Sequence, residues 1–333
     1  MTEPPPPSPT TTQETEVSPT WSVLMPFHGY FREWSVAVAL VSLLVVLRFA
    51  APGFYQLQPL LSLLTRESPT LVVTAGIALV MICRHVDISV GSVFGVCSVV
   101  AGLLWSRHWP APAVFVATVT CGGLAGMING GLVAGLRLPS IVVTLATMVT
   151  WREGLRWVRQ GEFVNLPENA QWLGLAQFSG QLSLVALSFL VFVVIYIASE
   201  YMVGGRYIYA VGSDREAARL AGVPASRVTF LTFVLLGILT GLAAWMGVVQ
   251  SPQVDPKAGA GLELKAIAAA VVGGVAVSGG RGNLWGVFVG LLLLVCVNPA
   301  LTHLHIEAHW EKAIQGGVIL IAVLADGWRG RFR

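Results

Sequence analysis

The chain consists of long apolar runs separated by short polar breaks. An α-helix needs about 20 mainly apolar residues to cross the hydrocarbon core of a bilayer. The runs predict an all-α polytopic membrane protein of about ten transmembrane helices. The expected spans are about 34–51, 69–84, 90–106, 112–135, 139–155, 182–199, 228–249, 264–278, 284–303 and 313–325.

One break falls between two spans that are both short for a full crossing. The second run stops at the polar stretch from Arg84 to Ser89, and the third run resumes at Val90. Non-helical backbone is tolerated at membrane depth only where other parts of the protein cover it. The pattern therefore predicts a broken or re-entrant segment near 84–90.

The two ends of the chain lack such runs. Residues 1–33 are rich in proline and are expected to form a disordered tail, 34–326 the transmembrane domain and 327–333 a basic tail. An even number of spans places both termini on one side, and Arg329, Arg331 and Arg333 favour the cytoplasm. The same topology makes the 200–227 loop cytoplasmic and the 152–181 loop external. The aromatic and charged residues of 152–181 suit either a protein-docking surface or an interfacial belt.

Composition agrees with a membrane protein. The chain has 333 residues, 55% hydrophobic and 11% charged, with a mean hydropathy of +0.74, whereas soluble domains carry about 25% charged residues. A net charge of +3 gives no case for nucleic-acid binding. The four cysteines lie in apolar runs without metal-site spacing, so we expect packing residues and no cofactor or metal bound by this chain.

Glycines recur at intervals that suit close helix contacts. Gly122, Gly126 and Gly130 are four residues apart, as are Gly131 and Gly135, and Gly286 and Gly290. Small residues at this spacing let helix backbones approach closely in a membrane. We expect tight helix–helix seams there.

Several kinds of chemistry have no sequence basis. No phosphate-binding Gly-x-x-x-x-Gly-Lys-Ser/Thr loop occurs, so the chain does not itself hydrolyse a nucleotide in that manner. Nearly all Asp, Glu and His residues fall in expected loops or at span boundaries, which argues against a stand-alone secondary carrier or channel, the main alternative function. No nucleophile and base stand at a recognisable spacing, which argues against an intramembrane hydrolase.

The longest polar insertion on the expected cytoplasmic side runs from Ser199 to Arg227. Its centre is typical of a short capped helix, with Ser213 or Asp214 at the start and Gly222 at the end. Such a helix is either a solvated connector or a knob that docks into a cytoplasmic partner.

Four blocks of sequence decide between the solvated connector and the docking helix. The segment GRYIYAVGSDREAARLAGVPASRV resembles the cytoplasmic coupling segment of bacterial ABC-type sugar permeases, the branch that serves ribose, xylose, rhamnose and autoinducer-2. Blocks at 86–104, 129–148 and 261–290 resemble the same family in order and spacing. The resemblance implies a non-enzymatic inner-membrane subunit of an importer. Its partners would be two cytoplasmic ATPases, a second permease (identical or sister), a periplasmic sugar-binding protein and membrane lipid.

The resemblance also assigns residues. The coupling helix maps onto Glu216, Ala217, Ala218, Arg219, Leu220, Gly222 and Val223. Glu216 and Arg219 are the expected polar contacts with the ATPase, while the alanines and Gly222 would allow close approach.

Polar residues in or beside apolar spans are candidates for the substrate pathway, although each could equally make an interhelical hydrogen bond. They are Asp87, Ser89, Ser92, Asn129, Thr144, Thr147, Glu263 and Lys265. The last two are two positions apart and so face different ways on a helix, which implies no mutual pairing. Lys265 departs from the acidic residue of ribose permeases and favours the autoinducer-2 or rhamnose branch.

Overall fold

A computed structural model of the chain describes residues 31–50, 52–303, 310, 312–317 and 319–320. The predicted tails up to residue 30 and from 327 lie outside these residues, as do residues 318 and 321–325 of the span expected at 313–325. The helices and strands are α1 (Phe31–Ala50), η2 (Pro52–Tyr55), α2 (Leu57–Ile82), α3 (Val90–Ser106), α4 (Ala111–Gly130), η3 (Gly131–Gly135), α5 (Ser140–Arg159), β1 (Val164–Asn165), η4 (Glu168–Gly174), α6 (Gln177–Tyr201), α7 (Val203–Ser213), α8 (Arg215–Leu220), α9 (Ala225–Val249), β2 (Gln253–Val254), α10 (Leu262–Val272) and α11 (Leu284–His303).

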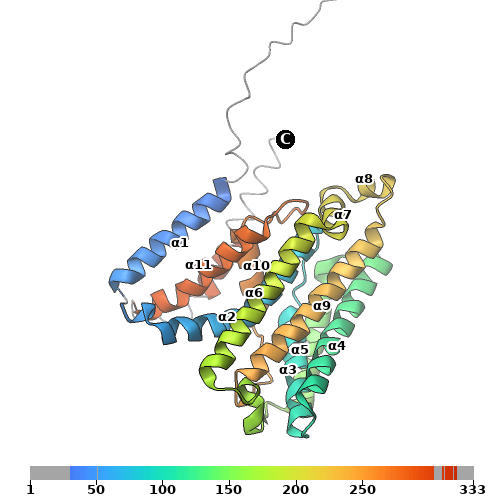
Figure 1. Ribbon diagram of the computed structural model, residues 1–333. Helices are drawn as coiled ribbons and strands as arrows, with labels where there is room; N and C mark the ends of the chain where they lie inside the picture. The colour runs from blue at the N-terminus through green and yellow to red at the C-terminus, as the bar shows by residue number, and fades with distance from the viewer. Residues whose placement is uncertain (1–30, 51, 304–309, 311, 318, 321–333) are drawn as a thin grey trace, which may run out of the picture.

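The described residues form a helical bundle with one minimal sheet, in which Val164 pairs with Val254. Figure 1 shows α1 beside α11 at one side of the bundle, α4 and α5 at the other, and α8 at one end. Among the described residues, five helices are long and apolar enough to cross a membrane: α2, α4 with η3, α6, α9 and α11. An all-helical, multi-pass protein is thus confirmed, whereas the count of ten spans is not.

The second span is longer than predicted. It was expected to begin at 69, but α2 begins at Leu57 and continues through Pro69. Polar residues before Pro69 suggest a break in the sequence, yet they are satisfied within the fold. Thr65 and Ser68 donate to carbonyls four residues earlier, and Glu67 pairs with Lys265 of α10.

The break predicted near 84–90 is present. Helix α2 ends at Ile82, α3 begins at Val90, and the intervening link is not helical. Asp87 and Ser89 within it are 4% and 0% exposed. Protein therefore covers the polar part of the link, as a non-helical segment inside a membrane bundle requires.

A second link repeats the first. Residues 254–259 follow the long helix α9 with the pattern Val-Asp-x-x-x-Gly, which also occupies 86–91 after α2. In each link the aspartate Oδ1 accepts a hydrogen bond of 2.8 Å from the backbone N–H two residues later, that of Ser89 or Lys257. A short apolar helix and then a 20-residue helix follow in both cases.

The two links meet inside the bundle. A Cβ placed on Gly91 would meet the carbonyl oxygen of Gly259, and one placed on Gly259 would meet the carbonyl oxygen of Gly91. Helix α2 ends beside α7 and α8, where the Ile82 carbonyl lies against Gly212 and Cys83 packs with Ala218, whereas α9 begins after α8 and leads away from that end. The two units are therefore arranged as inverted repeats around this contact.

The glycine seams are confirmed in part. Gly122 and Gly126 of α4 lie directly against the backbone of α9 at Gly237, and Gly290 of α11 lies against Gly273. A Cβ placed on Gly131 or Gly135 would meet no atom within 4 Å. These two glycines belong to the π-helical turn η3 and not to a seam.

The seam between α4 and α9 can be tested with two identical changes. We expect Gly122→Ala to lower the free energy of unfolding by about 1–3 kcal/mol, because the methyl group must push two backbones apart. Gly131→Ala adds the same methyl group in open space and is the control. Thermal unfolding of the detergent-purified variants gives the comparison, and equal midpoints would contradict the seam.

Candidate functional site

The short helix α8 lies between α7 and α9 at one end of the bundle (Figure 1). Asp214 caps it, accepting hydrogen bonds of 2.9 Å from the N–H groups of Glu216 and Ala217. Gly222, with a φ of +83°, ends it in the left-handed region that glycine adopts at no steric cost. The capped helix expected from the sequence is therefore present, with Asp214 rather than Ser213 as the cap.

Glu216 and Arg219 form a two-pronged ion pair on the outer surface of α8. Arg219 donates from Nε to Oε2 at 3.0 Å and from a terminal nitrogen to Oε1 at 2.6 Å. The hydrogen bonds and charge of Arg219 lower the pKa of Glu216, and those of Glu216 raise the pKa of Arg219. Both side chains are 66% exposed, so the pair is presented to whatever lies beyond this end of the bundle.

The remaining coupling candidates divide between two faces. Ala217, Leu220 and Gly222 are exposed, and Leu220 is 76% exposed. Ala218 is buried instead and packs inward with Cys83 and Val211, with Val223 half-buried beside it. The exposed members form a continuous outer surface, whereas Ala218 and Val223 anchor the helix.

The elements beneath α8 are tied to α2 and to the turn between α10 and α11. The Gly280 N–H donates to the carbonyl oxygen of Ile82 at 2.8 Å, and the Tyr209 hydroxyl of α7 donates to Gly282 O at 2.9 Å. Gly212 of α7 lies directly against the Ile82 carbonyl. These contacts join α7, the end of α2 and the turn before α11 beneath α8.

Four pathway candidates come together in one buried network at the first link. Asn129 of α4 donates from Nδ2 to Ser89 Oγ at 2.8 Å and to Asp87 Oδ2 at 3.3 Å. Ser89 Oγ donates to Asp87 Oδ1 at 2.6 Å, and Ser92 Oγ to the Ser89 carbonyl at 2.7 Å. These contacts are interhelical and local hydrogen bonds of the kind that the sequence left open as the alternative to substrate contact.

The threonines of α5 lie close by. Thr144 is buried and bonds to the carbonyl oxygens of Ser140 and Val86, at 2.9 and 3.4 Å. Thr147 is half-buried and donates to Thr144 O at 3.2 Å. Thr144 therefore helps to fasten the link, while Thr147 stands nearer to the surface of α5.

Glu263 and Lys265, whose spacing implies no mutual pairing, each pair with a residue of another helix. Glu263 pairs with Arg152 of α5 at 3.2 Å, and Lys265 pairs with Glu67 of α2 at 2.9 Å. Among the described residues, Glu263 Oε2 is buried without a hydrogen-bond partner. The two ion pairs join α10 to two different helices.

This finding corrects one expectation. Acidic residues were expected to lie in loops or at span boundaries. Glu263 does lie in the first turn of α10, but Glu67 is 9% exposed in the middle of α2. Hydrophobicity alone did not place Glu67 inside a span, because its basic partner Lys265 lies far away in the sequence.

Comparison with known proteins places this geometry in context. Residues 60–323 match the family described as "Branched-chain amino acid transport system / permease component". The autoinducer 2 import system permease protein LsrC of Enterobacter sp. (strain 638) is 35% identical over 298 residues, 89% of this chain and 87% of that protein. The ribose import permease protein RbsC of Escherichia coli (strain K12) is 30% identical over 303 residues, 90% and 94%. No solved structure matches.

The hydrogen-bond network at the first link predicts that the stability of the fold depends strongly on Asp87. We expect Asp87→Ala to lower the free energy of unfolding by about 3 kcal/mol or more, because it strands the buried donors of Ser89 and Asn129. Asp255→Ala removes the equivalent turn in the second link, where the side chain is half-buried and water can replace it. Thermal unfolding should rank Asp87→Ala well below Asp255→Ala, and the reverse order would refute the network.

Proposed function

We propose that this chain forms the membrane pathway of an ATP-driven importer for a sugar or sugar-like solute, because it belongs to the family of branched-chain amino acid transport system permease components. It is a multi-pass inner-membrane transport subunit, not an enzyme. ATP hydrolysis and first capture of the solute belong to ATPase and substrate-binding partners. The relatives that carry autoinducer 2 and ribose support this solute class.

The structure of helix α8 is the main support for this proposal. It is a capped helix with an exposed charged pair and an exposed leucine, held by Ala218 against the ends of α2, α7 and α9. A helix fixed to the bundle on one face and bare on the other suits a knob in the groove of an ATPase. In this proposal Glu216, Ala217, Arg219, Leu220 and Gly222 touch the ATPase, and Ala218 and Val223 transmit its movement.

The assembly proposed is two copies of a permease, identical or sister, with two ATPases at the α8 end and a periplasmic binding protein at the other. Ten spans, with both termini and α8 in the cytoplasm, fit the alternation of helices along the chain. The 152–181 segment then lies on the periplasmic face, where it suits docking of the binding protein.

For the pathway we propose Thr147 on α5, and Glu263 and Lys265 with their partners Arg152 and Glu67. The side chain of Arg152 is 37% exposed, so this ion pair can be reached by a solute. Asp87, Ser89, Ser92, Asn129 and Thr144 shape the pathway by fixing the link beside it. Hydrogen bonding by the charged groups suits a polyhydroxylated solute.

The coupling surface can be tested by replacing both Glu216 and Arg219 with Ala. We expect the tagged double variant to lose most of the ATPase that co-purifies with the wild type in mild detergent. The matched control is Glu153→Ala with Arg156→Ala, an exposed pair of the same type and spacing at the far end of α5. Retained ATPase in the first variant, or equal loss in the control, would remove α8 from the interface.

The orientation is testable by cysteine labelling. We expect Ala217→Cys to react with a membrane-impermeant maleimide only in inside-out vesicles, and Glu153→Cys only in right-side-out cells. The native cysteines Cys83, Cys97 and Cys296 are buried and Cys121 is half-buried, so the unmodified chain gives the background. Labelling of both sites from one side would contradict the topology.

A further inference from the structure

A pocket of about 500 Å³ opens at the α8 end of the bundle, where three separate segments approach one another. The link after α2 contributes Arg84 and His85, the turn between η3 and α5 contributes Arg137, and α5 and α8 contribute their first residues, Ser140 and Arg215. A volume of this size lies in the range of small-molecule sites. None of these residues takes part in the ion pairs or the network described above, apart from Ser140, whose carbonyl oxygen accepts from Thr144.

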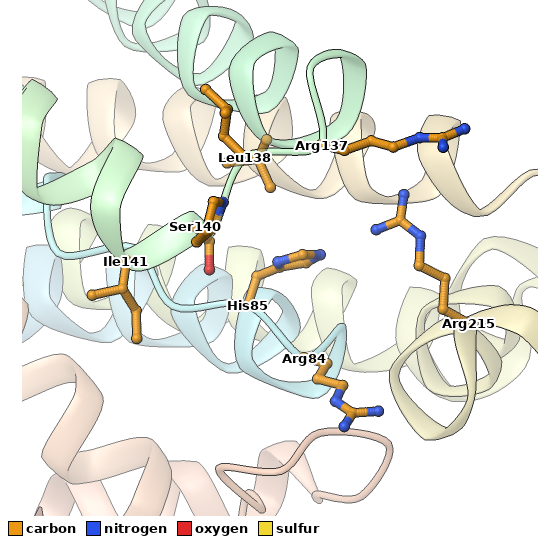
Figure 2. Close-up of a pocket in the computed structure, with 9 residues that line it drawn as sticks. Arg84, His85, Arg137, Leu138, Ser140, Ile141 and Arg215 are labelled. Atoms are coloured by element: carbon orange, nitrogen blue, oxygen red, sulfur yellow. The ribbon is translucent and has the colours of Figure 1, made fainter.

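The pocket carries positive charge without a counterion. No carboxylate in the described part of the chain lies within ion-pair distance of Arg84, Arg137 or Arg215. Arg215 donates a hydrogen bond of 3.2 Å to the neutral Ser226 hydroxyl. Figure 2 shows the Arg137 and Arg215 side chains on the same side of the pocket, with the His85 ring pointing towards them from the link.

His85 lies among these charged groups. Its side chain is half-buried, and Nε2 lies 3.5 Å from the Thr229 hydroxyl. A neutral imidazole can donate one N–H and accept one hydrogen bond.

The other walls fit a ligand with both a polar and an apolar part. Ser140 Oγ accepts a hydrogen bond from the Val86 N–H at 3.3 Å, which leaves its O–H proton as a donor. Leu138 and Ile141 form an apolar wall and are 43% and 53% exposed. Guanidinium groups bind phosphate with two parallel hydrogen bonds, and basic pockets between membrane helices suit lipid head groups.

We propose that this pocket binds a phosphate group, held by Arg137 and Arg215 and assisted by Ser140. The phosphate is carried either by an anionic phospholipid, whose glycerol carbons would lie on Leu138 and Ile141, or by a soluble phosphate. Because the arginines come from α8 and from the turn before α5, the bound anion joins the coupling helix to the body of the bundle. Phosphate thereby sets how firmly α8 is held, independently of the transported solute.

The test uses the full chain in nanodiscs made of phosphatidylcholine alone or with added phosphatidylglycerol. Bound phosphatidylglycerol is counted by native mass spectrometry after gentle release, and inorganic phosphate binding to the phosphatidylcholine nanodiscs is measured by calorimetry. Retention of phosphatidylglycerol identifies the lipid as the source, and binding of inorganic phosphate alone identifies the soluble anion. Either result supports the site if it depends on the arginines.

Dependence is tested with Arg137→Gln and Arg215→Gln, each expected to weaken binding about tenfold or more through loss of charged hydrogen bonds. Arg227→Gln, an exposed arginine at the same end of the bundle but outside the pocket, is the control. Arg137→Lys should restore part of the binding, which separates loss of charge from misfolding. Unfolding midpoints of all variants are compared for the same reason.

Two outcomes would overturn the proposal. In the first, neither probe binds the wild type; if Arg137→Gln then also weakens association with the ATPase, a carboxylate of that partner fills the pocket. In the second, Arg227→Gln weakens binding as much as the pocket variants do.

Discussion

The fold depends on satisfying backbone polar groups where helices are interrupted inside an apolar bundle. A lipid-exposed N–H or C=O costs several kcal/mol, so each interruption has to be covered by protein. The link after α2 meets this requirement with an aspartate that accepts from both its own turn and from Asn129 of α4. Once the link is fixed, the start of α3 and the adjacent end of α4 are fixed with it.

The same requirement explains why the polar residues inside the bundle are paired across helices. Glu67 with Lys265, and Glu263 with Arg152, connect α10 to α2 and to α5. A buried pair adds little net stability compared with apolar packing, but removing one partner is costly. Such pairs fix which helices lie together without requiring a strong attraction, a useful property in a bundle whose helices must shift against one another during transport.

Much of this arrangement could be predicted from the sequence, since the signals are local. The break at 84–90 follows from a polar run between apolar runs, and the capped helix follows from Asp214 and Gly222. The longer α2 could not be predicted, because Glu67 and Pro69 suggest a break and the partner of Glu67 lies in α10. Arg84, Arg137 and Arg215 likewise stand in three distant segments, each typical of a cytoplasmic flank, and only the folded chain brings them together.

The contact between Gly91 and Gly259 limits how the sequence of this chain can change. Each glycine faces the main chain of the other, so a side chain on either would separate the two halves at their centre. Neither position can vary on its own, even though the two glycines lie far apart in the sequence. A substitution at this point of one half therefore has to be accommodated by the backbone of the other half.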